Sequence, residues 1–142
     1  MDDYFTLIKQ GNADSDADGI PDEYEIAHGL NRHISTDAIL DSDNDGAINR
    51  DEYVLGLNSQ VPDRYNYSVA RNAQTGVASV TFPTIAARNY RVWYSDTLTT
   101  WNPASSVIAG TGSNQVWVDD GSEIPAAAGN RRFYQIRVTT AP

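Results

Sequence analysis

Carboxylates recur at a fixed spacing in two stretches of the first half of the chain. Residues 14–25 and 41–52 each place an acid at positions 1, 3 and 5, a glycine at position 6 and a glutamate at position 12. A hard divalent cation such as Ca²⁺ takes about 6–8 oxygen ligands, so a short loop has to curl alternate side chains around one point, and a glycine permits the sharp bend. The spacing therefore predicts two calcium sites, one in each loop.

The same template assigns a ligand set to each loop, made of side-chain oxygens and one backbone carbonyl at position 7. In the first loop we expect the ligands Asp14, Asp16, Asp18, the carbonyl of Ile20, Asp22 and Glu25. In the second loop we expect the ligands Asp41, Asp43, Asp45, the carbonyl of Ala47, Asn49 and Glu52. Position 9 is expected to bind directly or through water. Magnesium fits less well, because it demands an octahedron and retains its waters. The acids of the empty loops repel one another, so we expect this part to fold with its metal.

The two loops belong to an internal repeat. Residues 14–31 and 41–58 are offset by 27 positions and are identical at nine of 18 positions, which indicates a tandem of two similar units. We expect a short helix after each loop, ended by Gly29 or Gly56, because glycine readily adopts the left-handed conformation that ends helices. The expected apolar sides of these helices are formed by Ile26, Ala27, Leu30, Tyr53, Val54 and Leu57. A further helix is expected over residues 2–10.

The spacing of the two loops differs from that of an ordinary EF-hand pair. The offset leaves too little chain for two full helices, and Pro21 occupies loop position 8, where paired EF-hands exchange backbone hydrogen bonds. With the runs DSDADGIPDEYE and DSDNDGAINRDEY, each followed by Gly-Leu, residues 14–58 resemble the thrombospondin type-3-like calcium repeats of secreted bacterial proteins. This resemblance implies the same ligands. Dockerins are the neighbouring family, but Glu23-Tyr24 and Arg50-Asp51 do not form the matched recognition pair that dockerin repeats carry.

The hydrophobic period changes to two beyond a short linker over residues 59–64. We expect strands over residues 65–70, 77–82, 90–95, 105–109, 115–119 and 132–139. Six short strands without a helical pattern predict a β-sandwich over residues 65–142, following a small α calcium-binding tandem over residues 1–58. The runs YRVWYS and RFYQIRV resemble the fibronectin type III-like or immunoglobulin-like C-terminal domains of large secreted proteins.

Alternation along the strands assigns two faces to the predicted sandwich. The expected core is formed by Tyr90, Val92, Tyr94, Val116, Val118, Tyr134, Ile136 and Val138. The opposite face would present Arg91, Trp93, Trp117, Phe133 and Arg137. Aromatic rings between arginines can stack on sugar rings and bind their hydroxyls, so this face is a candidate carbohydrate site. It could instead pack on the acidic repeats, and a shift of one residue in register would bury its rings.

Charge and composition exclude several classes of function. Residues 1–60 hold 14 acids and 3 bases, whereas residues 61–142 hold 5 acids and 7 bases. Nucleic-acid binding needs clustered cations, so the acidic half argues against such a partner. The absence of cysteine removes disulfides and thiol chemistry, and no apolar run approaches the ~20 residues of a membrane span. His28 and His33 lie near no nucleophile pattern, so we expect no catalytic triad and no enzymatic activity.

Together these patterns predict a non-catalytic, calcium-binding accessory module of a larger secreted or cell-surface bacterial protein. The repeats would act as a spacer or coupling to the preceding domain of that protein, and we expect a monomer. Extracellular calcium would fill even weak sites, which favours a place outside the cell. The acidic start Met1-Asp2-Asp3 is unlike a signal peptide, so we expect this chain to be a fragment if the native protein is exported. Two alternatives stay open: a polysaccharide-binding module of a degrading enzyme, and a dockerin-like protein-docking module.

Overall fold

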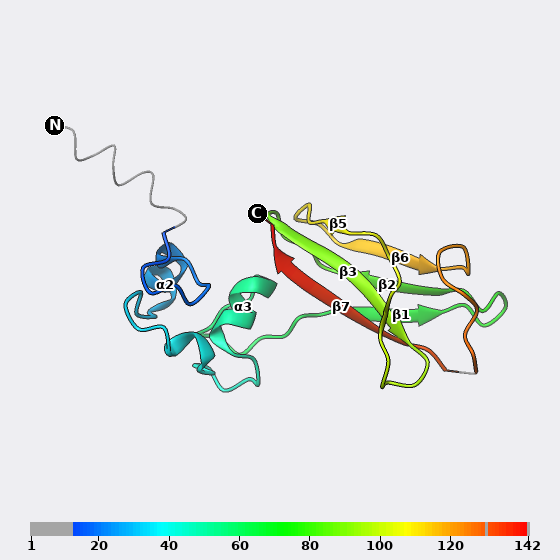
Figure 1. The fold of residues 1–142 in the computed structure, drawn as a ribbon, viewed down its shortest axis with the longest axis horizontal. Coiled ribbons are helices and arrows are strands. Elements are labelled where there is room, and N and C mark those ends of the chain that lie inside the picture. The colour runs from blue at the N-terminus through cyan, green and yellow to red at the C-terminus, as the bar shows by residue number, and fades with distance from the viewer. Residues whose placement is uncertain (1–12, 130, 142) are drawn as a thin grey trace. The chain divides into compact units, whose positions relative to one another are not determined.

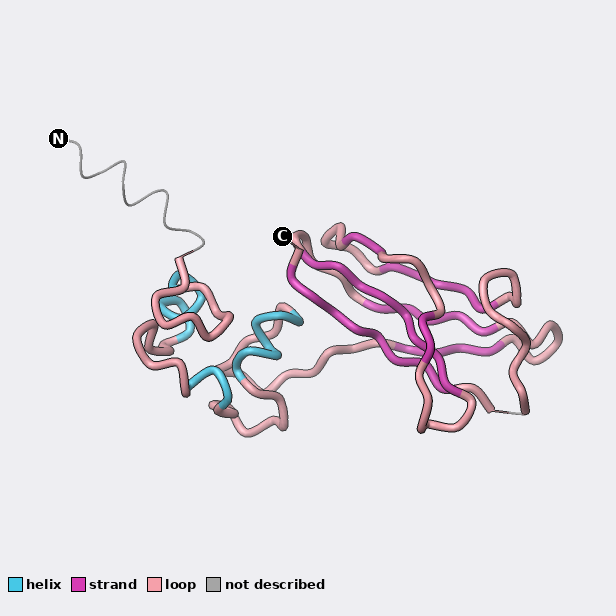
Figure 2. The backbone as a smooth tube through the Cα atoms, in the orientation of Figure 1, coloured by secondary structure: helices cyan, strands magenta, loops and turns pink. Residues whose placement is uncertain are grey.

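The chain divides into two compact units, one ending at Arg64 and one beginning at Tyr65 (Figure 1). A computed structural model describes residues 13–129 and 131–141, so the helix predicted over residues 2–10 lies outside the described residues. The described part is mostly β, with two sheets, two short α-helices and one 3-10 helix. Figure 2 shows the helices in the first unit and the strands in the second.

Each acidic loop of the first unit leads into a short helix. Helix α2 spans Asp22–His28, η2 is a 3-10 helix over Asp37–Ile39, and α3 spans Asn49–Leu55. Both α-helices end at a left-handed glycine, with φ of 70° at Gly29 and 74° at Gly56, as predicted. The N–H groups of the leucines that follow donate to the carbonyls of Glu25 and Glu52, at 2.8 and 2.9 Å. The two repeats therefore share one local structure.

Aromatic side chains connect the two repeats. The ring of Tyr24 packs edge-on against Tyr53, with centroids 5.1 Å apart, and its hydroxyl donates to the carbonyl of Leu57 at 3.2 Å. The apolar side predicted for α2 is wrong at Ile26, whose side chain is 64% exposed. The reason is that Asp22 and Glu25 occupy the buried side of this helix, and a neighbouring residue is rotated by about 100° around the axis.

The second unit contains two antiparallel sheets, an arrangement compatible with a β-sandwich. The strands are β1 (Ser68–Arg71), β2 (Ala78–Phe82), β3 (Arg88–Ser95), β4 (Asn102–Pro103), β5 (Ile108–Ala109), β6 (Gln115–Asp119) and β7 (Phe133–Thr140). One sheet has the order β1-β2-β6. In the other, β3 pairs with β7 on one side and with β4 and β5 on the other.

The core of the second unit confirms the predicted faces of β3 and β7 and corrects that of β6. Tyr90 and Val92 are buried, and the inward residues of β7 pack against them. In β6, however, Trp117 is in the core at 7% exposed, whereas Val116 and Val118 are 59% and 43% exposed. Trp117 pairs with Val80 of β2 and shares its inward face. The prediction failed by one residue, because burying an indole removes more apolar surface from water than burying a valine.

Candidate metal sites

The two acidic loops have the same backbone conformation. Position 4 is left-handed in both, with φ of 60° at Ala17 and 64° at Asn44, and the glycines at position 6 have φ of 96° and 103°. In the first loop the N–H groups of positions 5 and 6 donate to the carboxylate of Asp14, at 3.2 and 3.0 Å. The second loop repeats both bonds at Asp41, at 3.2 and 3.1 Å. These bonds fix the first acid of each loop and curl the chain around it.

Each loop gathers five carboxylates into two overlapping groups of three. Within a group, the oxygens that could hold a metal lie within 4.8 Å of one another. The groups of the first loop are Asp14, Asp16 and Asp18, and then Asp18, Glu25 and Asp37. The groups of the second loop are Asp41, Asp43 and Asp45, and then Asp45, Glu52 and Asp63. We call these two sets of five the first and the second acidic cluster; either could hold a metal ion.

The glutamates of the two clusters are fully buried without hydrogen bonds. Glu25 and Glu52 are each 0% exposed, and neither oxygen of either side chain has a partner. Further buried, unpartnered oxygens in the clusters belong to Asp16, Asp18, Asp37, Asp43 and Asp63. Because buried polar groups in folded proteins are nearly always paired, converging acceptors of this kind need a cation or protons between them.

Burial and repulsion by neighbouring carboxylates raise the pKa values of both glutamates. Loss of hydration raises the pKa of Glu25 to about 7, and the nearby charges of Asp16 and Asp18 act in the same direction. Burial likewise raises the pKa of Glu52 to about 7, with Asp43 and Asp45 contributing. Without a cation, these side chains therefore take up protons near neutral pH.

The structure brings together eight of the predicted side-chain ligands, and the ligand role of position 9 stays a prediction. Both oxygens of Asp22 accept hydrogen bonds from Ser15, from its N–H and its hydroxyl, each at 2.7 Å. The side-chain amide of Asn49 donates to the carbonyl of Asp37 at 2.7 Å, whereas its Oδ1, the atom that would bind a metal, is buried without a partner. The predicted carbonyl ligands of Ile20 and Ala47 stay predictions.

Asp37 and Asp63 complete the clusters and were missed in the sequence. Asp37 begins η2, and its Oδ2 accepts the N–H of Asn31 at 2.7 Å. Asp63 lies in the segment that was assigned to a linker; its Oδ2 accepts the N–H of Asn58 at 3.3 Å. A signal was present, because an acid follows the repeated asparagine in both copies, after six residues in one and after five in the other. This difference of one residue hides the match at an offset of 27.

The aromatic face predicted for the second unit is only partly assembled. Arg91, Trp93 and Arg137 meet beside a hollow of about 230 Å³. The guanidinium of Arg137 lies 3.7 Å from the centroid of the Trp93 ring, and that of Arg91 lies 5.8 Å away. Trp93 is therefore already stacked by a cation, which leaves less of its ring for a sugar. Trp117 is in the core, where its Nε1 donates to Glu123 at 3.2 Å, and Phe133 lines a different cavity.

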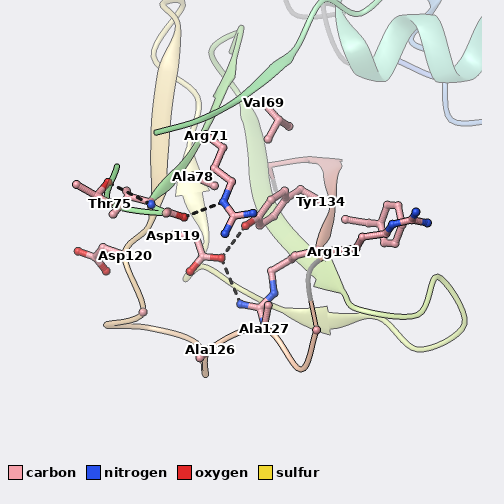
Figure 3. Close-up of a pocket in the computed structure, with 16 residues that line it drawn as sticks. Val69, Arg71, Thr75, Ala78, Asp119, Asp120, Ala126, Ala127, Arg131 and Tyr134 are labelled. Atoms are coloured by element: carbon pink, nitrogen blue, oxygen red, sulfur yellow. Dashed lines mark hydrogen bonds and ion pairs between the residues drawn. The ribbon is translucent and has the colours of Figure 1, made fainter. Parts of the chain in front are cut away.

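That larger cavity of the second unit has a volume of about 590 Å³ (Figure 3). Asp119 connects two of the surrounding side chains, because its Oδ2 accepts hydrogen bonds from the hydroxyl of Tyr134 at 2.6 Å and from the Nη1 of Arg132 at 3.2 Å. Arg132 also donates from Nε to Asp96 at 2.8 Å. Arg71 projects into the same region in Figure 3 and donates from Nε to the carbonyl of Gly76 at 3.2 Å. The volume lies within the range of about 300–1,000 Å³ that is usual for small-molecule sites.

Comparison with protein families, with curated proteins and with solved structures finds no match to this chain. No helix in the described part of the chain is both long and apolar enough to cross a membrane. The assignment of a function therefore depends on the geometry of the two clusters and of the cavity.

Proposed function

We propose that the first unit binds two calcium ions, one in each acidic cluster, and serves as a non-catalytic accessory module of a larger secreted or cell-surface bacterial protein. One observation carries this proposal. Glu25 and Glu52 are fully buried with no hydrogen-bond partner, and each lies among aspartates in one of two equivalent loops. A buried carboxylate that is neither paired nor bonded is costly, and a divalent cation removes this cost.

The chemistry of the ligands favours calcium among the common divalent ions. All five acids in each cluster offer oxygen, which hard cations prefer. A structural zinc site would call for cysteine or histidine; the chain has no cysteine, and the Nδ1 of His28 lies 2.8 Å from the carbonyl of Tyr24. Five carboxylates suit the 6–8 oxygens that calcium typically takes better than the octahedron of magnesium, which retains several waters.

Calcium would order the first unit and extend this order to its end. Asp63 lies only two residues before Tyr65, at which the second unit begins. An ion in the second cluster would therefore hold the segment 59–63 through the Asp63 carboxylate. This arrangement supports the role of a spacer or coupling whose stiffness depends on calcium, as would suit the calcium-rich exterior of a cell.

Titration calorimetry with calcium tests the proposal, using variants that each remove one site. We expect two ions per chain in the unmodified protein and one in Glu25→Gln or Glu52→Gln. Glu23→Gln and Asp51→Asn are matched controls, because each removes one charge from an exposed neighbour on the same helix. They should retain two ions. The proposal would be wrong if the protein took up no calcium, or if the glutamate variants still bound two ions.

A second candidate function, carbohydrate binding by the second unit, is favoured by the larger cavity. Asp119 and Arg71 offer an acceptor and donors there, beside the rings of Phe133 and Tyr134. Such a combination binds sugar hydroxyls and stacks on their apolar faces. A glycan-array screen with calcium and with chelator tests this, with Arg71→Ala to disable the cavity and Trp93→Ala to disable the smaller hollow. Absence of binding to every glycan would exclude this function.

A further inference from the structure

A buried amide joins the second loop to the first acidic cluster. Asn49 is the first residue of α3 and is 0% exposed. Its Nδ2 donates to the carbonyl of Asp37 at 2.7 Å, and its backbone N–H donates to the carbonyl of Leu40 at 2.8 Å. Asn49, in the second repeat, thus bonds to the first residue of η2 and to the residue that follows η2. This short helix in turn supplies the carboxylate of Asp37 to the first cluster.

The backbone carbonyl and the side-chain carboxylate of Asp37 contact different repeats. Its carboxylate faces the first cluster, where Oδ1 is buried without a partner, whereas its carbonyl is held by Asn49. Glu52 of the second cluster follows Asn49 by three residues on the same short helix. Any ordering of the start of α3 by an ion at Glu52 therefore also fixes the donor that positions Asp37.

We propose that the two sites bind calcium with positive cooperativity and that Asn49 transmits the coupling between them. This inference rests on the proposed calcium function and concerns its regulation. Ordering η2 and the start of α3 lowers the conformational entropy of the chain. Once the first ion has ordered these segments, binding of the second ion loses less entropy and is therefore tighter. Because coupling between binding sites is reciprocal, each ion raises the affinity of the other site by the same factor.

The equivalent residues of the first loop repeat the backbone bond, since the N–H of Asp22 donates to the carbonyl of Ala13 at 2.7 Å, but their side chains make different contacts. Asp22, which matches Asn49 in the repeat, bonds to Ser15 of its own loop. Asp63, the counterpart of Asp37, donates from its N–H to Asp45 at 3.1 Å within its own cluster. The packing of Tyr24 on Tyr53 does not involve Asn49, so the repeats should stay together when Asn49 is replaced.

A double-mutant cycle with calcium titrations measures this coupling. Glu52→Gln and Glu25→Gln each leave one site, whose separate affinities are compared with the two-site isotherm of the unmodified protein. We expect the first site to bind calcium about tenfold more weakly in Glu52→Gln than when the second site is filled, within the usual range of coupling. Asn49→Asp keeps an oxygen for the second site, as Asp22 does in the first loop, but removes the amide donor to Asp37. With Asn49→Asp present, the state of the second site should change the affinity of the first by less than about twofold.

Several outcomes separate this inference from the proposed function itself. Two ions bound independently in the unmodified protein would overturn the coupling and leave the calcium sites intact, whereas no uptake at all would overturn both. Coupling that persists unchanged in Asn49→Asp and in the smaller polar variant Asn49→Ser would overturn the role of Asn49. Gln60→Ala, at an exposed position, is the control that should retain full coupling. Circular dichroism at saturating calcium verifies that each variant is folded.

Discussion

Removing calcium with a chelator at about pH 8.5 should unfold the first unit and leave the second folded. At this pH both buried glutamates are well above their pKa of about 7, so they carry charge. The carboxylates of each cluster then repel one another with nothing between them. The second unit has no such cluster among its described residues, and its core is apolar.

The size of the repulsion can be estimated from the distances. Two unit charges 4.8 Å apart repel by about 1 kcal/mol in water and by about 3.5 kcal/mol at an effective dielectric constant of about 20. The oxygens of Asp45, Glu52 and Asp63 form three pairs that are no farther apart than this, so their repulsion amounts to at least about 3 kcal/mol in water and at least about 10 kcal/mol at the lower dielectric constant. Since a typical domain is stable by only about 5–15 kcal/mol, one empty cluster is enough to decide whether the unit folds.

The distribution of aromatic residues allows each unit to be followed separately. Trp93, Trp101 and Trp117 all lie in the second unit, so tryptophan fluorescence reports on that unit alone. Amide resonances of residues 13–64 report on the first. On chelation we expect these resonances to collapse to the unfolded range, while the melting temperature from tryptophan fluorescence changes by less than about 2 °C. Added calcium should restore the resonances. The reasoning is refuted if they stay dispersed in excess chelator.

Three further predictions test particular residues. Asp63→Asn should weaken calcium binding at the second site by at least about tenfold, and Asp37→Asn should do the same at the first site; in each variant the other site should lose less affinity, because only the coupling reaches it. Site-resolved calorimetry decides, and equal loss at both sites would contradict the assignment. The raised glutamate pKa values mean that the folded, metal-free unit binds more protons than the unfolded chain between about pH 4.5 and 7. Its thermal stability without calcium should therefore fall as the pH rises through this window, while calcium affinity rises because protons no longer compete; flat profiles would argue against buried glutamates. Trp117→Ala should destabilise the second unit by about 3–5 kcal/mol in denaturant unfolding, and Val116→Thr by less than about 0.5 kcal/mol; similar losses would refute the observed register.

The sequence was informative where the chemistry is local. Position within a loop determines which acids converge, so the side chains at positions 1, 3, 5 and 12 could be identified from spacing. Asp63 was missed because it lies outside the loop, and because its spacing from Asn58 is one residue shorter than that of Asp37 from Asn31. For the position-9 residues the spacing could not foretell the hydrogen bonds that the fold adds, from Ser15 to Asp22 and from the amide of Asn49 to the carbonyl of Asp37.

The face of β6 shows a different limit of sequence reasoning. The run Val116-Trp117-Val118 is apolar at every position, so alternation does not say which side faces inward. The pairing of Trp117 with Val80 decides it. In β3, by contrast, Arg91 lies between Tyr90 and Val92, and the charge marks the outward face.

The buried residues of the two units imply that their stabilities depend differently on the cations in solution. In the second unit the core includes Val80, Phe82, Tyr90 and Val92, whose burial is favourable in any salt. In the first unit two of the largest fully buried side chains are Glu25 and Glu52. Burial of an unpaired carboxylate opposes folding, and a bound cation would offset this cost. If the clusters bind calcium as we propose, the stability of the first unit should rise with the calcium concentration, and a chelator should unfold it without a denaturant.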